Sequence, residues 1–177
     1  MKIRTLYLRS QRRRHWLAAS RRPPLSAHWR DWLCQRESLT QSLILASQGQ
    51  FQVRLLRLSR DFPSRDEACV LGIPPHRRVL IREVELMGKN QVWVYARSVV
   101  PDATLSHCHQ ALHQLGNRSL GSLLFSDPRI RRGAIQVTHL RDGKEVYPAR
   151  RSVFYLDTHP LLVTEVFLPV MASVPRR

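Results

Sequence analysis

The sequence predicts an α+β fold: a six-stranded antiparallel sheet with helices packed on one face. Six segments have the pattern of strands, and turn signals at 88–90 and 142–143 join neighbouring strands as hairpins. Helical patterns are concentrated near the start and the middle of the chain. A doubly wound parallel sheet would need a helix between successive strands, so the order of elements favours the antiparallel arrangement.

Two helices are expected before the first strand. Ser26 is a suitable N-cap for a helix that runs through Trp32 and Leu33. The segment Ser38-Leu39-Thr40 interrupts this pattern and starts a second helix, which ends at Gly49.

The first strand begins at Phe51, where the apolar period changes to two. The alternation of apolar and polar residues shifts by one position at Leu55 and Leu56. Either a bulge keeps the leucines on the core side, or the strand ends there. A polar loop is expected to follow. A helix over 106–115 and a short helical piece over 122–125 separate two groups of later strands, which are 79–87, 91–100, 133–140, 150–156 and 161–168.

The chain is expected to form one domain over residues 25–170, after a flexible basic arm over 1–24 and before a loose tail over 171–177. The net charge of +16 indicates an anionic partner: nucleic acid, anionic lipid or an anionic metabolite. Residues 1–30 contain nine Lys and Arg but no acid, and in this they resemble an organelle transit peptide. They have no recognisable nucleic-acid-binding motif, which favours a solvated arm over a nucleic-acid binder.

Cysteine and histidine spacing gives little sign of a metal or a disulfide. Cys34, Cys69 and Cys108 are odd in number and widely spaced, which indicates reduced thiols in a cytoplasmic protein. His109 and His113 would share a helix face, but no acid or cysteine completes a metal site. No run is long and apolar enough to predict a membrane span, and there is no secretion signal.

Glu165 is the most unusual residue in the predicted strands. Side chains alternate along a strand, so Glu165 shares an apolar face with Val163 and Phe167. Arg82 is a second charged residue on an apolar strand face. The other face of its strand carries Glu83 and Glu85 and is expected to be solvated. The two groups suggest a charged pair in an apolar cavity, and a buried salt bridge without a function is the alternative.

Three other arginines and two turns are further candidates. Arg97 alternates with Trp93 and Tyr95, and stacking on one of these rings at the sheet surface is slightly favoured over a site role. Of Arg150 and Arg151, one must face the core side if both lie in a strand, and edge-strand charge is the alternative. Free N–H groups at the turns 38–40 and 120–121 could hold a carboxylate, although ordinary helix capping is favoured.

An ordered set of segments over residues 29–169 resembles the chorismate pyruvate-lyase family. Each segment is short, and it is their order and spacing that make the set specific. The segments are Asp31-Trp32-Leu33, Ser38-Leu39-Thr40, Arg82-Glu83-Val84, Arg97-Ser98-Val99-Val100-Pro101 with Thr104-Leu105, Leu115-Gly116, Leu120-Gly121, Leu124-Phe125 and the run from Leu161 to Pro169. The basic arm and the high net charge are not features of the family.

The resemblance implies a lyase that needs no metal or organic cofactor and converts chorismate into pyruvate and 4-hydroxybenzoate for ubiquinone biosynthesis. It assigns Glu165 and Arg82 as the catalytic and substrate-binding pair. It assigns Leu39 and Leu120 as residues that hold the aromatic product through backbone groups; one member of the family has Met where this chain has Leu39, and a backbone contact would survive that change. Arg97 or Arg151 would add positive potential.

Two other functions remain open at this point. The same fold resembles the effector-sensing domain of some bacterial transcription regulators, although residues 1–30 are too short for their winged-helix domain. Nucleic-acid binding through the basic arm is the third reading, and it is the least supported. No nucleophile elbow, P-loop, dinucleotide fingerprint or zinc motif is present. The lyase hypothesis predicts a monomer with small-molecule partners only.

Overall fold

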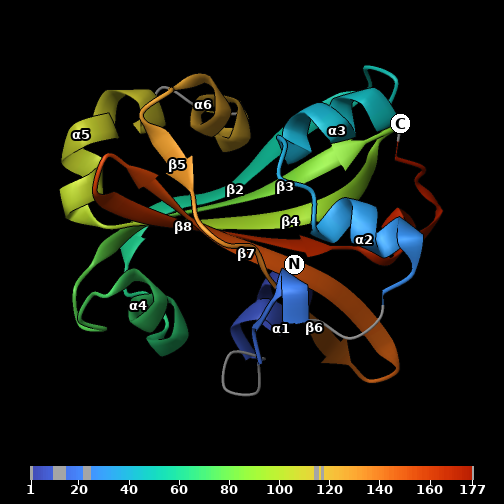
Figure 1. Ribbon diagram of the computed structural model, residues 1–177, viewed down its shortest axis with the longest axis horizontal. Coiled ribbons are helices and arrows are strands. Elements are labelled where there is room, and N and C mark those ends of the chain that lie inside the picture. The colour runs from blue at the N-terminus through green and yellow to red at the C-terminus, as the bar shows by residue number, and fades with distance from the viewer. Residues whose placement is uncertain (1, 10–14, 22–24, 114–115, 117, 177) are drawn as a thin grey trace.

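Eight strands form one antiparallel sheet in the computed structural model, which describes residues 2–9, 15–21, 25–113, 116 and 118–176 (Figure 1). The sheet order is β1-β6-β7-β8-β4-β3-β2, and β5 pairs with β7. The strands are β1 (Leu17–Ala18), β2 (Phe51–Asp61), β3 (Val79–Gly88), β4 (Gln91–Val100), β5 (Ile130–Arg132), β6 (Gln136–Asp142), β7 (Glu145–Leu156) and β8 (His159–Phe167). The predicted α+β class is confirmed, and the short strands β1 and β5 extend the expected six.

Helices cover both faces of this sheet (Figure 1). On one face, α2 and α3 pack over one core cluster and α5 and α6 over another; on the opposite face lie α1 and α4. Helices were expected on one face only, whereas α1 and α4 also cover the other face. The helices are α1 (Lys2–Arg9), α2 (Ala27–Leu33), α3 (Leu39–Ala46), α4 (Arg65–Leu71), α5 (Asp102–His113) and α6 (Leu120–Ser126), with 3-10 segments η2 (Ala19–Arg21) and η3 (Pro169–Ser173).

Local sequence signals account for several element boundaries. The hydroxyl groups of Ser26 and Ser38 accept hydrogen bonds from the first turns of α2 and α3, as the N-cap pattern predicted. Helix α4 lies in the expected polar loop, where Ser64 and Glu67 form a capping box. In β2 the register with β3 shifts at Leu55, so the bulge is correct and the strand continues to Asp61.

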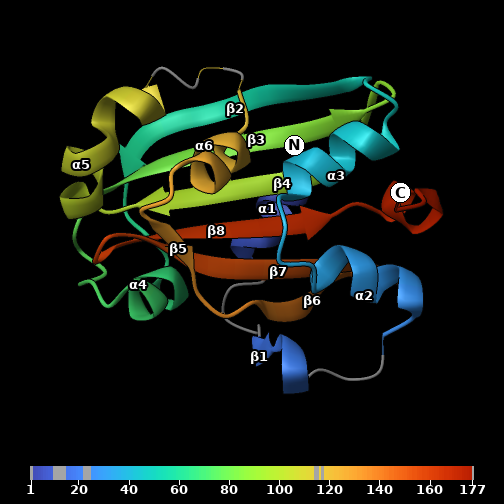
Figure 2. The ribbon, with the colours of Figure 1, turned by 45° about the horizontal axis from the view of Figure 1, so that its top comes forward.

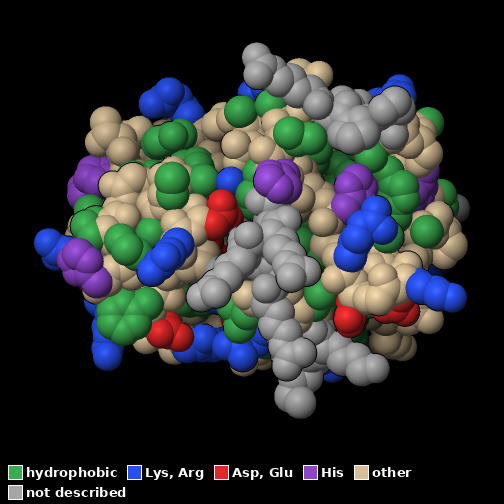
Figure 3. All heavy atoms as spheres, turned by 90° about the horizontal axis from the view of Figure 1, so that it is seen from below, with side chains coloured by type: hydrophobic (Ala, Val, Ile, Leu, Met, Phe, Trp, Pro, Cys, Tyr) green, Lys and Arg blue, Asp and Glu red, His purple; other side chains and the backbone are tan. Residues whose placement is uncertain are grey.

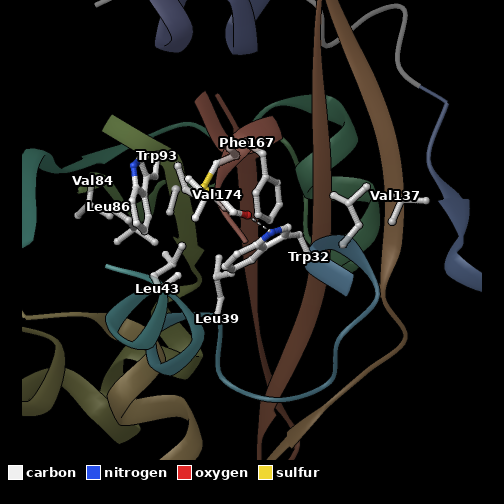
Figure 4. Packing of buried hydrophobic residues seen from close by; sticks show 14 of the residues in the cluster. Trp32, Leu39, Leu43, Val84, Leu86, Trp93, Val137, Phe167 and Val174 are labelled. Carbon is white, nitrogen blue, oxygen red and sulfur yellow. Dashed lines mark hydrogen bonds between the residues drawn. The ribbon is translucent and has the colours of Figure 1, made fainter. Parts of the chain in front are cut away.

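Both chain ends contribute to the core. In α1, Ile3 and Tyr7 are buried against the sheet, which differs from the expected flexible arm for residues 2–9. Near the other end, Met171 and Val174 are buried, and the Trp32 indole donates to the Val174 carbonyl at 3.3 Å (Figure 4). The segment 171–174, expected as part of a loose tail, therefore packs on α2 and α3.

The face that carries α1 and α4 has its basic side chains scattered among acidic and apolar ones (Figure 3). Among the residues that Figure 3 colours by type, the basic ones do not form a single patch on this face. None of the described helices is long and apolar enough to cross a membrane.

Candidate active site

Helices α3 and α6 lie over the same face of the sheet (Figure 2), and residues at their N-termini line a cavity together with residues of the sheet. The charged side chains that line it are Arg82, Arg132, Arg150 and Glu165. Its apolar lining comes from the sheet and from α3 and α6, and consists of Leu39, Val84, Leu86, Ala96, Leu120, Leu124, Phe125, Phe154 and Val163. The cavity therefore combines an apolar surface, which suits a ring, with a few charged groups around it.

Arg82 reaches this cavity from β3. It is 3% exposed, and its Nη2 donates to the carbonyl oxygens of Gly116 and Arg118 at 3.0 and 2.7 Å. Burial lowers the pKa of its guanidinium below the ordinary arginine value. Among the described residues no carboxylate pairs with it, so Arg82 brings a positive charge that only neutral carbonyls solvate.

Glu165 enters the same cavity from β8, and its partner is Arg150. The two residues are directly opposite in the β7–β8 register, and Arg150 Nε lies 2.5 Å from Glu165 Oε2. This corrects the expectation that Arg82 and Glu165 pair with each other. Arg150 also donates to the carbonyls of Trp32 and Gln35, so its own position is fixed. Within the described chain, Glu165 Oε1 accepts no hydrogen bond and remains available to a ligand.

The N-termini of α3 and α6 meet at the cavity. Leu39 and Leu120 are the first residues of these helices, so their N–H groups have no acceptor within the helix. A hydrogen bond between Thr40 Oγ1 and Ser119 Oγ joins the two ends. The predicted pair Leu39 and Leu120 thus comes together with Arg82 and Glu165 around one space.

Gly121 permits this close approach of the two helices. A Cβ added at Gly121 would lie 2.6 Å from Thr40 Oγ1, well inside van der Waals contact. We expect Gly121→Ala to separate α6 from α3, to destabilise the fold by about 1–3 kcal/mol and to weaken ligand binding in the cavity. Denaturant unfolding checks the first effect. The double variant Gly121→Ala/Thr40→Ala removes the clashing oxygen and should recover part of the loss; a single variant as stable as the wild type would contradict this account.

Arg97 does not reach the cavity. It alternates along β4 with Ala96 and Ser98, which face the cavity, and its own side chain lies on the opposite face of the sheet. There it donates to Glu67 at 2.8 and 3.1 Å and to Glu83 at 2.6 Å. It is buried rather than stacked at the surface, because α1 and α4 cover this face.

Arg151 also lies on the opposite face, next to α4. It donates to Asp66 at 2.6 Å and to Gln136 at 2.7 Å, and its guanidinium lies 4.3 Å from the Trp16 ring centre. Of the two adjacent arginines, Arg150 therefore faces the cavity. Neither Arg97 nor Arg151 can contact a ligand there, which corrects their expected place in the site.

The ion cluster around Arg97 is expected to stabilise the fold. Replacing Arg97 with methionine would leave the buried Glu67 carboxylate without its cation and Glu83 with only the partly exposed Arg4, at a cost of about 3–5 kcal/mol in unfolding free energy. The control Arg60→Met removes an exposed pair with Asp102 and should change the free energy by no more than about 1 kcal/mol. Equal stabilities of the two variants in urea unfolding would contradict this role.

The same ion cluster should make the stability of the fold depend on pH. Burial alone would raise the pKa of Glu67, but hydrogen bonding and attraction to Arg97 exceed that effect and hold the pKa below its usual value. A carboxyl whose pKa is lowered on folding stabilises the folded state above its unfolded pKa. We therefore expect the stability advantage of the wild type over Arg97→Met to shrink as the pH falls through the lowered pKa of Glu67. A difference in unfolding free energy that is constant from neutral to acid pH would contradict this.

Two arginines of the cavity were not assigned to the site from the sequence. Arg132 lies in the three-residue strand β5, for which the sequence predicted no separate strand, and Arg150 was considered only together with Arg151. Burial and the nearby Arg150 charge lower the pKa of Arg132 to about 10, so it remains protonated at neutral pH. Three arginines and one glutamate therefore give the lining a net charge of +2.

Metal-ligating side chains do not gather in the described residues: no group of three or more His, Cys, Asp or Glu is present there. The side chains of His109 and His113, which the sequence placed on one helix face, lie outside the described residues. The arrangement in the cavity suits an organic anion that is held by arginines and backbone N–H groups.

A sequence model described as "Chorismate lyase" matches residues 10–174. The chain belongs to the chorismate lyase family. A relative named probable chorismate pyruvate-lyase from Chromohalobacter salexigens is 41% identical, with 92% of this chain and 94% of the relative covered. Another of the same name from Methylococcus capsulatus is 39% identical, with 81% and 96% covered. Most of the chain, including every charged residue of the cavity, lies inside the family match.

Solved structures of low sequence identity share the fold. A GntR-family transcriptional regulator from Bacillus cereus superposes with a TM-score of 0.54 at 13% identity, covering 68% of this chain and 93% of the regulator. The C-terminal domain of the histidine utilization repressor from Pseudomonas syringae gives 0.53 at 11% identity, covering 72% and 97%. These similarities show that the chorismate lyase family and such regulator domains have a common architecture.

Proposed function

We propose that this chain is a chorismate pyruvate-lyase, which eliminates pyruvate from chorismate and releases 4-hydroxybenzoate for ubiquinone biosynthesis. Membership of the family and the names of relatives near 40% identity support the reaction. The observation that supports this reaction in this chain is the cavity, which is lined by Arg82, Glu165, Leu39 and Leu120. Its net charge of +2 complements chorismate, which carries two carboxylates.

The reaction is redox-neutral and ends in an aromatic ring. The bond between C3 of the ring and the enolpyruvyl oxygen breaks, and the proton on C4 leaves. The electrons of the C4–H bond complete the ring, which keeps its hydroxyl at C4. The enolpyruvate that departs takes up one proton on its methylene carbon and becomes pyruvate, so protons balance. Aromatisation provides much of the driving force, so the protein needs to supply orientation, charge and one base.

Glu165 acts as that base and orients the ring. Its Oε2 is held by Arg150, while Oε1 is left for the substrate. The carboxylate accepts a hydrogen bond from the C4 hydroxyl and removes the proton from the same carbon. The N–H groups of Leu39 and Leu120 bind the ring carboxylate, which lies para to that hydroxyl. This orientation places the ring on the apolar surface between Glu165 and the two helix N-termini.

Arg82 neutralises substrate charge and assists the departure of the enolpyruvyl oxygen. A fixed cation in an apolar cavity stabilises developing negative charge more strongly than water does, because it does not have to reorient. The two carbonyls that bind Arg82 orient it without cancelling its charge. We therefore assign Arg82 to the leaving group and Glu165 to the proton.

Incubation of the purified protein with chorismate tests this function. We expect equimolar 4-hydroxybenzoate and pyruvate, measured by absorbance and by a coupled lactate dehydrogenase assay. Tight binding of 4-hydroxybenzoate without formation of either product would favour a non-catalytic small-acid-binding domain, the role suggested by the shared fold of the regulator domains. That outcome would overturn the proposed lyase.

A further inference from the structure

Arg132 is a cation of the cavity that has no carboxylate partner in the described part of the chain. Its Nε donates to Ser152 Oγ at 3.0 Å, and its Nη1 donates to the carbonyls of Gln35 and Arg36 at 3.3 Å. The one carboxylate that lines the cavity, on Glu165, is bound by Arg150 instead. Among the described contacts, Nη2 of Arg132 donates to no acceptor.

The surroundings of Arg132 make an anion at this place favourable. The side chain is half-buried, its guanidinium lies 5.3 Å from the Phe154 ring centre, and the like charge of Arg150 is near. Removing a cation from water beside another cation costs free energy unless an opposite charge compensates. Glu165 compensates one of these two arginines, and the second positive charge is left for a ligand.

Arg132 and Arg82 lie on opposite sides of the cavity. Arg82 is on β3, whereas Arg132 is on β5, which pairs with β7; β4 and β8 run between β3 and β7. With strands about 4.8 Å apart, β3 and β7 are separated by roughly 14 Å of sheet. The Arg82 side is next to the residues that precede α6, whereas Arg132 is next to Arg150 and Glu165.

We propose that Arg132 binds the enolpyruvyl carboxylate of chorismate and thereby distinguishes the substrate from its aromatic product. The inference rests on the proposed lyase function. With the ring carboxylate at the helix N-termini and the C4 hydroxyl at Glu165, the enolpyruvyl group on C3 lies beside Glu165, with its ether oxygen on the Arg82 side and its carboxylate on the Arg132 side. The product 4-hydroxybenzoate keeps only the ring carboxylate. Arg132 therefore contributes to binding of the substrate and of the departing pyruvate, and not to retention of 4-hydroxybenzoate.

A purely structural role for Arg132 is the alternative that a test must exclude. Its bonds to Gln35, Arg36 and Ser152 join β5 and β7 to the segment before α3. Loss of that connection would disturb the whole cavity and weaken every ligand alike. Loss of a carboxylate subsite would instead weaken only ligands that carry the enolpyruvyl carboxylate.

The experiment compares Arg132→Gln and Arg132→Lys with the wild type in steady-state kinetics and in binding of 4-hydroxybenzoate. We expect the KM for chorismate to rise about 10- to 100-fold in Arg132→Gln, on the scale of one charge-assisted hydrogen bond. The inhibition constant of 4-hydroxybenzoate should stay within about twofold, and Arg132→Lys should recover part of the chorismate affinity. Arg131→Gln is the matched control, because Arg131 is its exposed neighbour in β5 and does not line the cavity; it should leave both constants unchanged.

Two outcomes would overturn the assignment: an unchanged KM in Arg132→Gln, or parallel weakening of chorismate and 4-hydroxybenzoate. A wild type that forms no product would contradict the lyase function itself. Calorimetric titration with chorismate would then still compare the affinity of the wild type with that of Arg132→Gln, because this measurement does not need turnover. Thermal unfolding of both variants shows whether either has lost its fold.

Discussion

Replacing Glu165 with glutamine is expected to lower the turnover number for chorismate by about 100-fold or more, on the scale of a lost general base. The amide is close in size to the carboxylate: its one oxygen can accept the Arg150 hydrogen bond, and its NH2 group can donate to the ring hydroxyl. It cannot remove a proton at neutral pH. The variant therefore separates base catalysis from orientation, and steady-state formation of 4-hydroxybenzoate measures the difference.

Glu145→Gln is the control for this substitution. Glu145 is exposed at the start of β7 and lies outside the cavity lining, so its loss of charge should leave turnover unchanged. If Glu165→Gln kept most of its turnover while its binding of 4-hydroxybenzoate also stayed normal, Glu165 would only position the ring. The assignment of the base would then be wrong, even though the location of the site would stand.

Replacing Arg82 with alanine is expected to reduce turnover by about 100-fold or more, because the developing charge on the leaving oxygen would lose its fixed cation. Arg82→Lys keeps a positive charge but cannot reproduce the planar fork that holds the carbonyls of Gly116 and Arg118. We expect the lysine variant to lie between alanine and the wild type. Single-turnover kinetics separates this effect from product release.

Arg78→Ala is the matched control, since Arg78 is an exposed arginine directly before β3 and lies outside the cavity lining. It should turn over chorismate at the rate of the wild type. Near-normal turnover in both Arg82→Ala and Glu165→Gln would contradict the proposed roles of this pair.

The alternation of side chains along a strand predicted which residues face the cavity. The inward positions of Arg82 and Glu165 follow from alternation along β3 and β8, and the structure brings both to one cavity. Their mutual contact could not be inferred that way. Alternation gives the face of a strand, whereas the partner depends on which strand is adjacent, and β7 places Arg150 beside Glu165.

The opposite face was mispredicted because its covering helices were missed. Glu83 and Glu85 were expected to be solvated, but α1 and α4 bury that side of the sheet. The spacing of Ser64 and Glu67 is a capping-box signal that could have revealed α4. Helix α1 lies in a segment rich in arginine, where the composition suggested a solvated arm and concealed the apolar pair Ile3 and Tyr7.

The position of Arg132 could not be predicted from the residues near it in the sequence. Strand β5 has only three residues, and its place in the sheet depends on pairing with residues of β7 that lie 22 to 26 positions further along the chain. Leu39 and Leu120 were reached through family resemblance, because a pair of helix starts is by itself a generic signal. The structure adds the reason for their proximity, namely the Thr40–Ser119 contact and the missing side chain at Gly121.

The most direct test of the account is a crystal structure of the protein with bound 4-hydroxybenzoate. We predict the product in the cavity over β3, β4 and β8, with its carboxylate at the N–H groups of Leu39 and Leu120 and its hydroxyl at Glu165. Density for the product elsewhere on the molecule would contradict the location of the site. A reversed orientation, with the hydroxyl at the helix N-termini, would contradict the roles given to Glu165 and Arg132.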